Sequence, residues 1–374
     1  MIWLPFLAGA GGVLYVLALY PVYLGWRARR NLPIAPRPQT PSVSVILPVR
    51  NGERWLRQKL DAILSLDYPA PLLQIIVVSD GSTDASAAIA ASFADRGVLF
   101  IEVPHGGKAL ALNAGLAVAT GEILFLTDVR QPLDPVCLRR LTACFADPSV
   151  GAASGELIIR KGESQEEESV GLYWEYEKWI RRRLSRIDSV MGATGAIYAM
   201  RRELAKPLPA GILLDDVYLP MLAFFAGKRV VFEERAIAYD DPTSLDAEFR
   251  RKVRTQAGVL QILWYFPQLL GPSNRMWIHF VSHKLGRLLL PYCLILIAVG
   301  TFLLPAPWRV LASSAQALVY GLALLDPVIP DGAALKRLTS PARTFVVLMA
   351  AAFWAGSILF RSSDSFWKPA GIRK

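Results

Sequence analysis

Long apolar segments at both ends of the chain constrain the fold more than any other feature. The first runs from Ile2 to Tyr23 almost without charge and is followed by Arg27, Arg29 and Arg30. About 20 apolar residues span the hydrocarbon core of a bilayer, and clustered Arg residues mark its cytoplasmic side. The basic start and small-residue cleavage site of a signal peptide are missing. We therefore expect an N-terminal transmembrane anchor over residues 1–26, with the following chain in the cytoplasm.

Three further apolar stretches lie near the other end of the sequence: Leu285–Leu304, Val310–Leu325 and Thr344–Phe360. The last two are short for a bilayer span. We expect about three transmembrane helices within residues 285–360, preceded by amphipathic interface helices over 246–284 and followed by a basic tail over 361–374. Four spans in total would leave the C-terminus outside, whereas the basic tail favours the inside, so the sequence leaves this orientation open.

Between the apolar ends, runs of strand length alternate with segments of helical spacing. The expected strands are Val43–Val49, Ile75–Val78 and Ile123–Leu126, and the expected helices are 56–63, 84–94 and 108–119. Such alternation predicts βαβ units around a mainly parallel sheet. We expect a cytoplasmic α/β domain over residues 40–245.

Two aspartates stand where predicted strands end. Asp80 follows Ile75–Ser79, and Asp128 follows Ile123–Thr127. In open parallel sheets, ligands bind beyond the carboxyl ends of the strands. Asp80 also begins Asp-Gly-Ser-Thr-Asp, a run that suits a turn and a helix N-cap, and this pentapeptide alone fits a plain turn as well as a binding site.

Several common protein classes lack their signatures here. No Walker loop occurs and no GxGxxG follows the first strand, which disfavours P-loop NTPases and dinucleotide enzymes. The net charge is +10, but many Lys and Arg flank the apolar segments, which indicates a membrane surface rather than nucleic acid. The three cysteines form no disulfide framework. His279 and His283 have a metal-binding spacing, but their apolar neighbours favour a structural role.

Five short motifs occur in the order found in membrane-bound family-2 glycosyltransferases. They are SVILPVRNGE at 44–53, IIVVSDGSTD at 75–84, GKALALNAG at 107–115, GATGAIYAMR at 192–201 and LDD at 214–216. The chain therefore resembles the inverting group that includes cellulose, chitin and hyaluronan synthases, from the N-terminal anchor to the end. The resemblance implies a type-A glycosyltransferase domain (GT-A, Rossmann-like) with flanking transmembrane helices.

The resemblance also implies which residues contact a nucleotide-sugar donor, with a UDP-sugar expected. The donor-binding residues it implies are Pro48, Arg50, Asn51, Glu53, Asp80, Lys108, Asn113, Asp128 and Arg130. Asp80 is expected near the base or ribose, and Lys108 and Asp128 near the phosphates.

The chemistry of the reaction requires the same residue types. A sugar leaves a diphosphate and joins an acceptor hydroxyl, and a carboxylate that removes the hydroxyl proton assists the attack. Asp216 is the candidate base and Asp215 a neighbouring orienter, although the two roles could be reversed. Gly195 belongs to the acceptor-side loop that the resemblance implies.

The motif that usually holds a divalent metal in these enzymes is altered. A DxD motif normally binds the ion that balances the charge of the departing diphosphate. Here the motif is Asp128-Val129-Arg130, so Arg replaces the second carboxylate. Two accounts stay open. Either Asp128 and the donor phosphates hold Mg²⁺ or Mn²⁺, which we favour, or Arg130 supplies part of the metal's charge.

A second motif is altered as well. Processive polysaccharide synthases carry QxxRW, and the corresponding positions here are Arg251, Arg254 and Thr255. Arg251 and Arg254 are expected near the acceptor and the diphosphate, but the acceptor-stacking Trp is absent. A basic helix at the membrane surface explains the same residues, since Val259–Phe266 is amphipathic, and both interpretations can hold together.

We therefore expect an inverting hexosyltransferase that moves a sugar from a nucleotide-sugar to a hydroxyl of a glycan or lipid-linked acceptor. It would act in cell-envelope or extracellular polysaccharide biosynthesis, integral to a bacterial-type inner (plasma) membrane and in contact with lipid rather than nucleic acid. The alternative is a catalytically silent nucleotide-binding subunit of a polysaccharide assembly complex. The sequence leaves the sugar, the acceptor, the linkage and the oligomeric state open.

Overall fold

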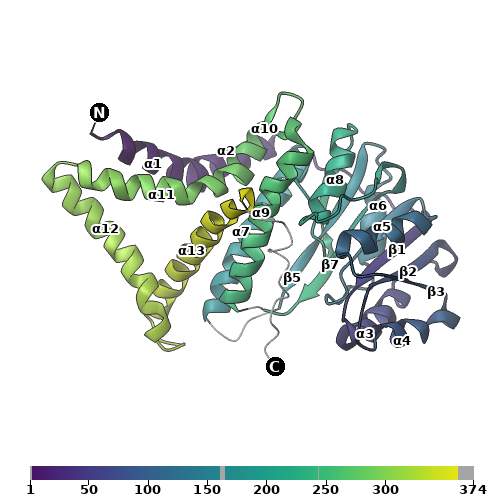
Figure 1. Cartoon of the computed structure of the whole chain (residues 1–374). Helices are drawn as coiled ribbons and strands as arrows, with labels where there is room; N and C mark the ends of the chain where they lie inside the picture. Colours follow the sequence, from purple (N-terminus) through teal and green to yellow (C-terminus); the bar gives the residue numbers. More distant parts are fainter. Residues whose placement is uncertain (1, 161–164, 243, 361–374) are drawn as a thin grey trace. The chain divides into compact units, whose positions relative to one another are not determined.

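The computed structural model describes residues 2–160, 165–242 and 244–360. The chain forms two compact units (Figure 1). The helical unit comprises Met1–Arg29, Lys161–Ile180 and Asp241–Lys374, and the sheet unit comprises Arg30–Arg160 and Arg181–Asp240. The basic tail expected over 361–374 lies outside the described residues.

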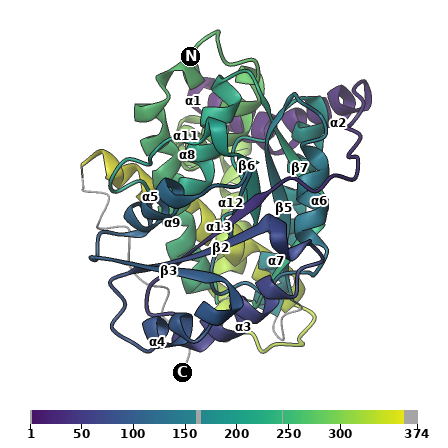
Figure 2. The ribbon, with the colours of Figure 1, turned by 90° about the vertical axis from the view of Figure 1, so that its right-hand side faces the viewer.

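The sheet unit contains a seven-stranded sheet in the order β3-β2-β1-β4-β6-β5-β7. Figure 2 shows this unit with β2, β3, β5, β6 and β7 labelled. The strands are β1 (Val43–Val49), β2 (Leu73–Asp80), β3 (Val98–Val103), β4 (Ile123–Leu126), β5 (Val150–Ile159), β6 (Tyr198–Arg201) and β7 (Arg229–Asp240). β6 runs antiparallel to β4 and β5, and the other pairs are parallel. The prediction of a mainly parallel α/β sheet is confirmed.

Helices connect these strands. They are α3 (Glu53–Leu64), α4 (Ser86–Ala91), α5 (Lys108–Val118), α6 (Cys137–Cys144), α8 (Asp215–Phe225) and the later part of α7 (Gln165–Ile187), with short 3₁₀ turns η2 (Ala70–Leu72), η3 (Ala94–Arg96) and η4 (Arg202–Leu204). α3 buries Leu56, Leu60 and Ile63, which recur at helical spacing and so form one apolar face. All seven positions of β1 are buried, as expected for a strand covered on both faces.

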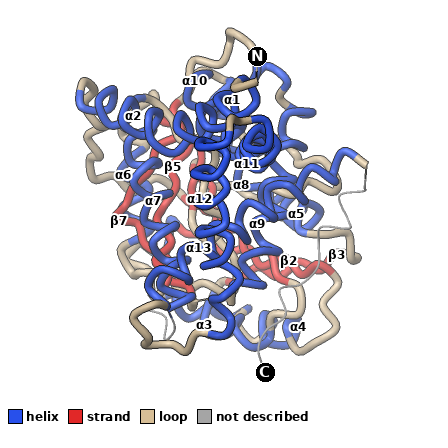
Figure 3. The backbone as a smooth tube through the Cα atoms, turned by 90° about the vertical axis from the view of Figure 1, so that its left-hand side faces the viewer, coloured by secondary structure: helices blue, strands red, loops and turns tan. Residues whose placement is uncertain are grey.

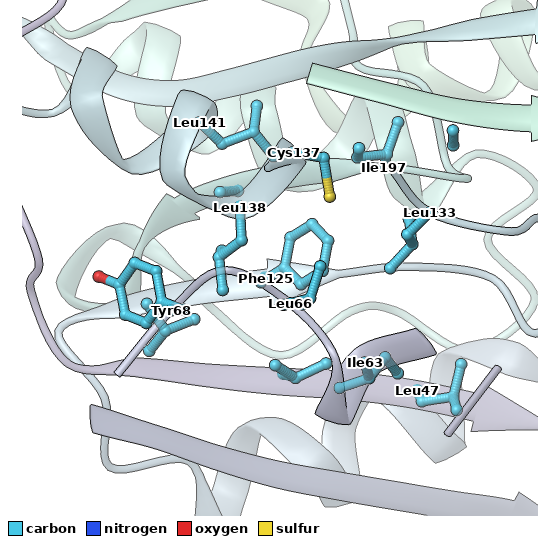
Figure 4. Close-up of a cluster of buried hydrophobic side chains, with 14 of the residues drawn as sticks. Leu47, Ile63, Leu66, Tyr68, Phe125, Leu133, Cys137, Leu138, Leu141 and Ile197 are labelled. Atoms are coloured by element: carbon cyan, nitrogen blue, oxygen red, sulfur yellow. The ribbon is translucent and has the colours of Figure 1, made fainter. Parts of the chain in front are cut away.

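One apolar cluster holds α3 and α6 against the sheet (Figure 4). It includes Leu47 of β1, Ile63 of α3, Phe125 of β4, and Leu138 and Leu141 of α6. Complete burial of such a side chain contributes roughly 1.5–3 kcal/mol to stability. This core fixes the ends of β1, β2 and β4, and therefore the loops that follow them.

The helical unit consists of long helices joined by short turns (Figures 1 and 3). Its elements are α1 (Leu4–Leu14), η1 (Tyr15–Leu19), α2 (Tyr20–Arg29), the first part of α7, α9 (Leu245–Tyr265), η5 (Pro267–Leu270), α10 (Trp277–His279), η6 (Phe280–Leu285), α11 (Gly286–Leu303), α12 (Ala306–Leu325), η7 (Asp326–Val328), α13 (Lys336–Ala355) and η8 (Gly356–Leu359). The elements η1 and η6 are π-helical turns.

Within the described residues, four helical segments are long and apolar enough to cross a membrane. They are Leu4–Arg29, Trp277–Leu303, Ala306–Val328 and Lys336–Leu359. The apolar stretches alone had suggested that the last two helices are short for a bilayer span. In the structure these helices have 23 and 24 residues, which is long enough. Polar residues at their ends continue each helix beyond its apolar stretch.

Candidate active site

An ammonium group joins three distant segments of the sheet unit. Lys108 begins α5, Asp128 follows β4, and Asp215 is the first residue of α8. Nζ of Lys108 lies 2.8 Å from Oδ1 of Asp128 and 3.1 Å from Oδ2 of Asp215. The Lys108 and Asp128 predicted at the phosphates therefore meet one member of the predicted acidic pair.

Gly195 brings the second member of the acidic pair into this cluster. Its backbone N–H donates to Oδ2 of Asp216 at 3.1 Å. A Cβ at Gly195 would lie 3.3 Å from that oxygen and 3.5 Å from Oδ2 of Asp128. Gly195 thus lies between two carboxylates, where any larger residue would crowd them. We call Lys108, Asp128, Asp215 and Asp216 the acidic cluster.

The carboxylates differ in accessibility. The Asp215 side chain is 9% exposed, whereas that of Asp128 is 37% exposed. Burial alone would lower the pKa of Lys108, but the charges of Asp128 and then Asp215 raise it above its usual range. Lys108 is therefore a permanent cation paired with both carboxylates, of which Asp128 is the more exposed.

Tyr198 of β6 is a neighbour that sequence reasoning missed. Its hydroxyl is buried and has no hydrogen-bond partner among the described residues. Burial first, and then the charges of Asp215, Asp216 and Asp128, raise the pKa of this phenol well above its ordinary value. Its position within GATGAIYAMR, three residues after Gly195, was the available signal.

Two residues predicted to bind the nucleotide-sugar, Asn51 and Glu53, form hydrogen bonds to the neighbouring loop. Oδ1 of Asn51 accepts from the Thr83 N–H at 2.8 Å, and Oε2 of Glu53 accepts from the Ala85 N–H at 2.9 Å. The Glu53 N–H in turn donates to Oδ2 of Asp84 at 2.9 Å. The loop after β1 and the loop after β2 are thus held together by side chains from both motifs.

Asp80 holds the turn that precedes α5. Its Oδ1 accepts from the N–H groups of Gly106 and Gly107 at 2.8 and 3.0 Å, and Nδ1 of His105 lies 3.1 Å from Oδ2. Gly107 has a φ of 87°, which favours glycine. The carboxylate predicted at the base or ribose therefore fixes the residue immediately before Lys108.

The other predicted donor residues occupy diverse positions. Pro48 is buried within β1, and Arg50 is exposed just beyond it. Asn113 donates to the Leu208 carbonyl at 2.9 Å and accepts from the Leu208 N–H at 2.7 Å, which anchors the segment leading to α8. Nη2 of Arg130 donates to Oδ2 of Asp240 at 2.6 Å.

Arg251 and Arg254 lie on α9 in the helical unit. Arg251 forms an ion pair with the buried Glu248, and its guanidinium lies 4.9 Å from the centre of the Trp174 ring. Nζ of Lys252 lies 4.9 Å from the same ring centre. The predicted acceptor residue Arg251 is thus part of an ion-pair and aromatic layer within this unit.

The protein side chains would bind a divalent metal only together with the phosphates of a nucleotide-sugar. No group of three or more His, Cys, Asp or Glu side chains in the described part of the chain is placed to hold an ion. However, Asp128 is partly exposed, and the acidic cluster has three carboxylates to one ammonium. Mg²⁺ typically binds one or two carboxylates plus substrate phosphates, and the carboxylates of the acidic cluster suit that arrangement.

Comparisons with known proteins identify the family. A model of glycosyl transferase family 2 matches residues 44–208, which include the acidic cluster's Lys108 and Asp128. Residues 44–208 of this chain are a family-2 glycosyltransferase domain. The enzyme class predicted from the motifs is confirmed, and we do not retain the alternative of a silent subunit. The narrower relation to cellulose, chitin and hyaluronan synthases stays a prediction.

Two curated relatives cover most of this glycosyltransferase. The probable glycosyltransferase YdaM of Bacillus subtilis (strain 168) is 26% identical over 286 residues, which cover 69% of this chain and 67% of that protein. An N-acetylglucosaminyltransferase of Rhizobium leguminosarum bv. viciae is 27% identical over 308 residues, which cover 75% of this chain and 70% of that protein.

A solved structure shares the fold. The mannosyltransferase PcManGT from Pyrobaculum calidifontis, in complex with GDP-Man and Mn²⁺, matches with a TM-score of 0.76 and 22% identity. The match covers 96% of this chain and 99% of that one. The prediction of a GT-A-like α/β fold with long apolar helices at the termini is confirmed.

Proposed function

We propose that this family-2 glycosyltransferase transfers a hexosyl group, with inversion, from a UDP-sugar to a hydroxyl of a membrane-associated glycan or lipid-linked acceptor. The observation that carries the proposal is the acidic cluster beside Gly195. It combines an accessible carboxylate and a permanent cation for a diphosphate with a second carboxylate, Asp216, close by.

In the proposed reaction, the acceptor oxygen forms a bond to the anomeric carbon as the bond from that carbon to the diphosphate breaks. The electron pair of the broken bond leaves with the nucleoside diphosphate. The acceptor proton passes to Asp216, because Asp215 is more deeply buried and paired with Lys108. Gly195 orients Asp216 through its N–H, and Lys108 supplies positive charge near the leaving phosphates.

A divalent ion bound by Asp128 and the donor phosphates would supply further charge stabilisation when present. The similar fold of a mannosyltransferase solved with GDP-Man and Mn²⁺ supports this assignment. It also supports a nucleotide-sugar donor. A GDP-sugar is then the alternative to the UDP-sugar that we expect.

We place the enzyme in a bacterial-type inner membrane, with its catalytic residues on the cytoplasmic side. Four long apolar helices support membrane insertion, and Arg27, Arg29 and Arg30 at the end of the first support this orientation. A membrane-embedded enzyme that consumes cytoplasmic nucleotide-sugars suits cell-envelope or extracellular polysaccharide biosynthesis.

Asp216→Asn tests the base. The variant should lose roughly 10²–10⁴-fold in transfer rate while donor binding persists, because the amide cannot take up the acceptor proton. Asp95→Asn, an exposed change in the same unit, is the matched control. Membranes containing each protein are supplied with a panel of UDP- and GDP-sugars, and both donor consumption and product are measured. Near-normal turnover by Asp216→Asn would reject the assignment.

Chelation tests the metal. Transfer by the wild type should fall strongly in excess EDTA and return with Mg²⁺ or Mn²⁺, and Asp128→Ala should weaken both donor binding and the response to metal. Full activity in EDTA would replace this account with the one in which Arg130 supplies the charge.

A further inference from the structure

The segment that carries Asp128 is held from one side by a buried lysine. Lys59 of α3 is 2% exposed, and its Nζ donates to Oγ1 of Thr127 at 2.8 Å and to the Gln131 carbonyl at 2.6 Å. These acceptors lie immediately before and just after Asp128-Val129-Arg130. One side chain therefore closes the segment 127–131, which we call the Asp128 loop.

Lys59 also connects the Asp128 loop to the residue next to Gly195. Oγ1 of Thr127 accepts from Lys59 and donates to the Ala196 carbonyl at 2.7 Å. The chain of hydrogen bonds thus runs from α3 through the Asp128 loop to the turn that binds Asp216.

A buried carboxylate holds the same loop from another side. Asp240, the last residue of β7, is 5% exposed. Its Oδ2 accepts from Nη2 of Arg130 at 2.6 Å and from Nε2 of Gln131 at 3.0 Å. The residue after the loop, Pro132, lies beside β7, and its carbonyl accepts from the Tyr239 N–H at 2.9 Å.

These contacts use groups that are costly to bury. Both hydrogen bonds of the Lys59 amine end on neutral oxygens, and an ammonium buried in this way costs free energy that an apolar side chain of similar size would not. Arg130 likewise directs its guanidinium to Asp240, although it occupies the motif position where related enzymes hold a metal-binding carboxylate. Polar contacts from two elements therefore fix the position of one short loop.

We propose that Lys59 and Asp240 are positioning residues for the donor. They hold the Asp128 loop from two sides, and Arg130 contributes its cation to this clamp through Asp240 rather than to the donor diphosphate. The proposal rests on the proposed role of Asp128 in donor binding. In this proposal, the role of Arg130 at the altered motif position is to hold the Asp128 loop in place.

A first experiment needs no substrate. Backbone hydrogen–deuterium exchange of the full chain in detergent is compared for wild type, Lys59→Met, Asp240→Asn and the control Asp67→Asn. Asp67 forms an exposed ion pair with Arg139 at 2.7 Å in the same unit. Exchange in peptides covering 127–131 should increase in both clamp variants, with β1 and β2 still protected, and should be unchanged in the control. Unchanged exchange at 127–131 in either clamp variant would overturn the proposal.

A second experiment separates the clamp from direct contact with the diphosphate. The donor turned over by the wild type, found with a panel of UDP-GlcNAc, UDP-glucose and GDP-mannose, is used with Arg130→Met, Asp240→Asn and the double variant. Each single variant should raise the donor KM roughly ten- to a hundredfold with a smaller change in kcat, because the loop is misplaced. The double variant should be no worse than either single one, as for partners in one interaction.

Direct diphosphate binding by Arg130 gives another pattern. Arg130→Met would then impair turnover while Asp240→Asn would not, and that result would contradict the clamp. A wild type that turns over no donor would contradict the proposed function, whereas the exchange experiment would still decide the clamp.

Discussion

Lys59 is a buried base whose protonation should affect stability. Burial lowers its pKa from the ordinary 10.5 to about 7, although the charges of Asp128 and Cys137 act in the opposite direction. Between pH 7 and 10.5 the unfolded chain keeps this proton and the folded chain does not. The contribution of Lys59 to the free energy of unfolding is therefore fully present above pH 10.5 and is lost as the pH falls towards 7, by at most about 5 kcal/mol.

This behaviour predicts a difference in pH dependence between variants. The midpoint of thermal unfolding of the wild type should rise relative to that of Lys59→Met as the pH increases from 7 to 9.5, because only the wild type carries the buried amine. Lys206→Met, which changes an exposed lysine of the same unit, should follow the wild type. Parallel curves for wild type and Lys59→Met would contradict the prediction. Calorimetry of the full chain in detergent makes the measurement.

The sequence indicated which residues to expect in the candidate site but not which residues pair with them. Lys108, Asp128, Asp216 and Gly195 gather in one place, as their motifs suggested. That Asp215 pairs with Lys108 depends on where α8 begins relative to α5, which no local pattern reports. The partner of Arg130, Asp240, is likewise distant in the sequence.

At the scale of elements, the contact between α5 and the sheet depends on a missing side chain. A Cβ at Gly115 would lie 2.7 Å from Cγ2 of Ile46 and 3.4 Å from Cγ2 of Val78. Ile46 is fully buried in β1, and its Cγ2 is attached to the branched Cβ, so it cannot swing away. The glycine allows α5, and Lys108 at its start, to lie close to the strands.

Gly115→Ala should therefore destabilise the protein by roughly 1–3 kcal/mol, although alanine favours helices, because the added methyl overpacks the contact. Gly321→Ala in α12 is the matched control, since a Cβ there has no described atom within 4 Å. That variant should be neutral or more stable by up to about 1 kcal/mol. Denaturation midpoints of the two variants decide the matter. A Gly115→Ala protein as stable as the control would show that the sheet can yield.

The success of the sequence at this scale varied with the length and pattern of each element. β1 and β4 have the predicted bounds, because continuous apolar runs mark strands buried on both faces. β6 has only four residues and lies between β4 and β5, so its existence depends on pairing with distant segments. Such pairing leaves no local periodicity to detect.

At the scale of the whole molecule, the helical unit bears on product length. Thr255 stands where the resembled synthases have an acceptor-stacking Trp, and its hydroxyl donates to the Arg251 carbonyl at 2.8 Å. Trp174 could have replaced that ring, but Arg251 and Lys252 already lie over it. Tyr176 of the same unit is stacked on Trp179, whereas Trp264 is 59% exposed.

We therefore predict that the enzyme adds one or a few sugars to each acceptor and releases it between turns. A processive synthase must retain a growing glycan, and an aromatic surface contributes to that retention. The size distribution of products at early times, with acceptor in excess, checks the prediction. Long chains beside unmodified acceptor would show processive extension and refute it.

The strand order of the sheet also determines how the protein can be assembled during synthesis. β1 to β4 pair in parallel and are complete once residue 126 has left the ribosome, whereas β6, which pairs with the other edge of β4, begins only at Tyr198. Until then the nascent half-sheet presents an unpaired apolar edge, the kind of surface at which chains aggregate. Translation speed and chaperone access between these two points should therefore affect the yield of folded enzyme.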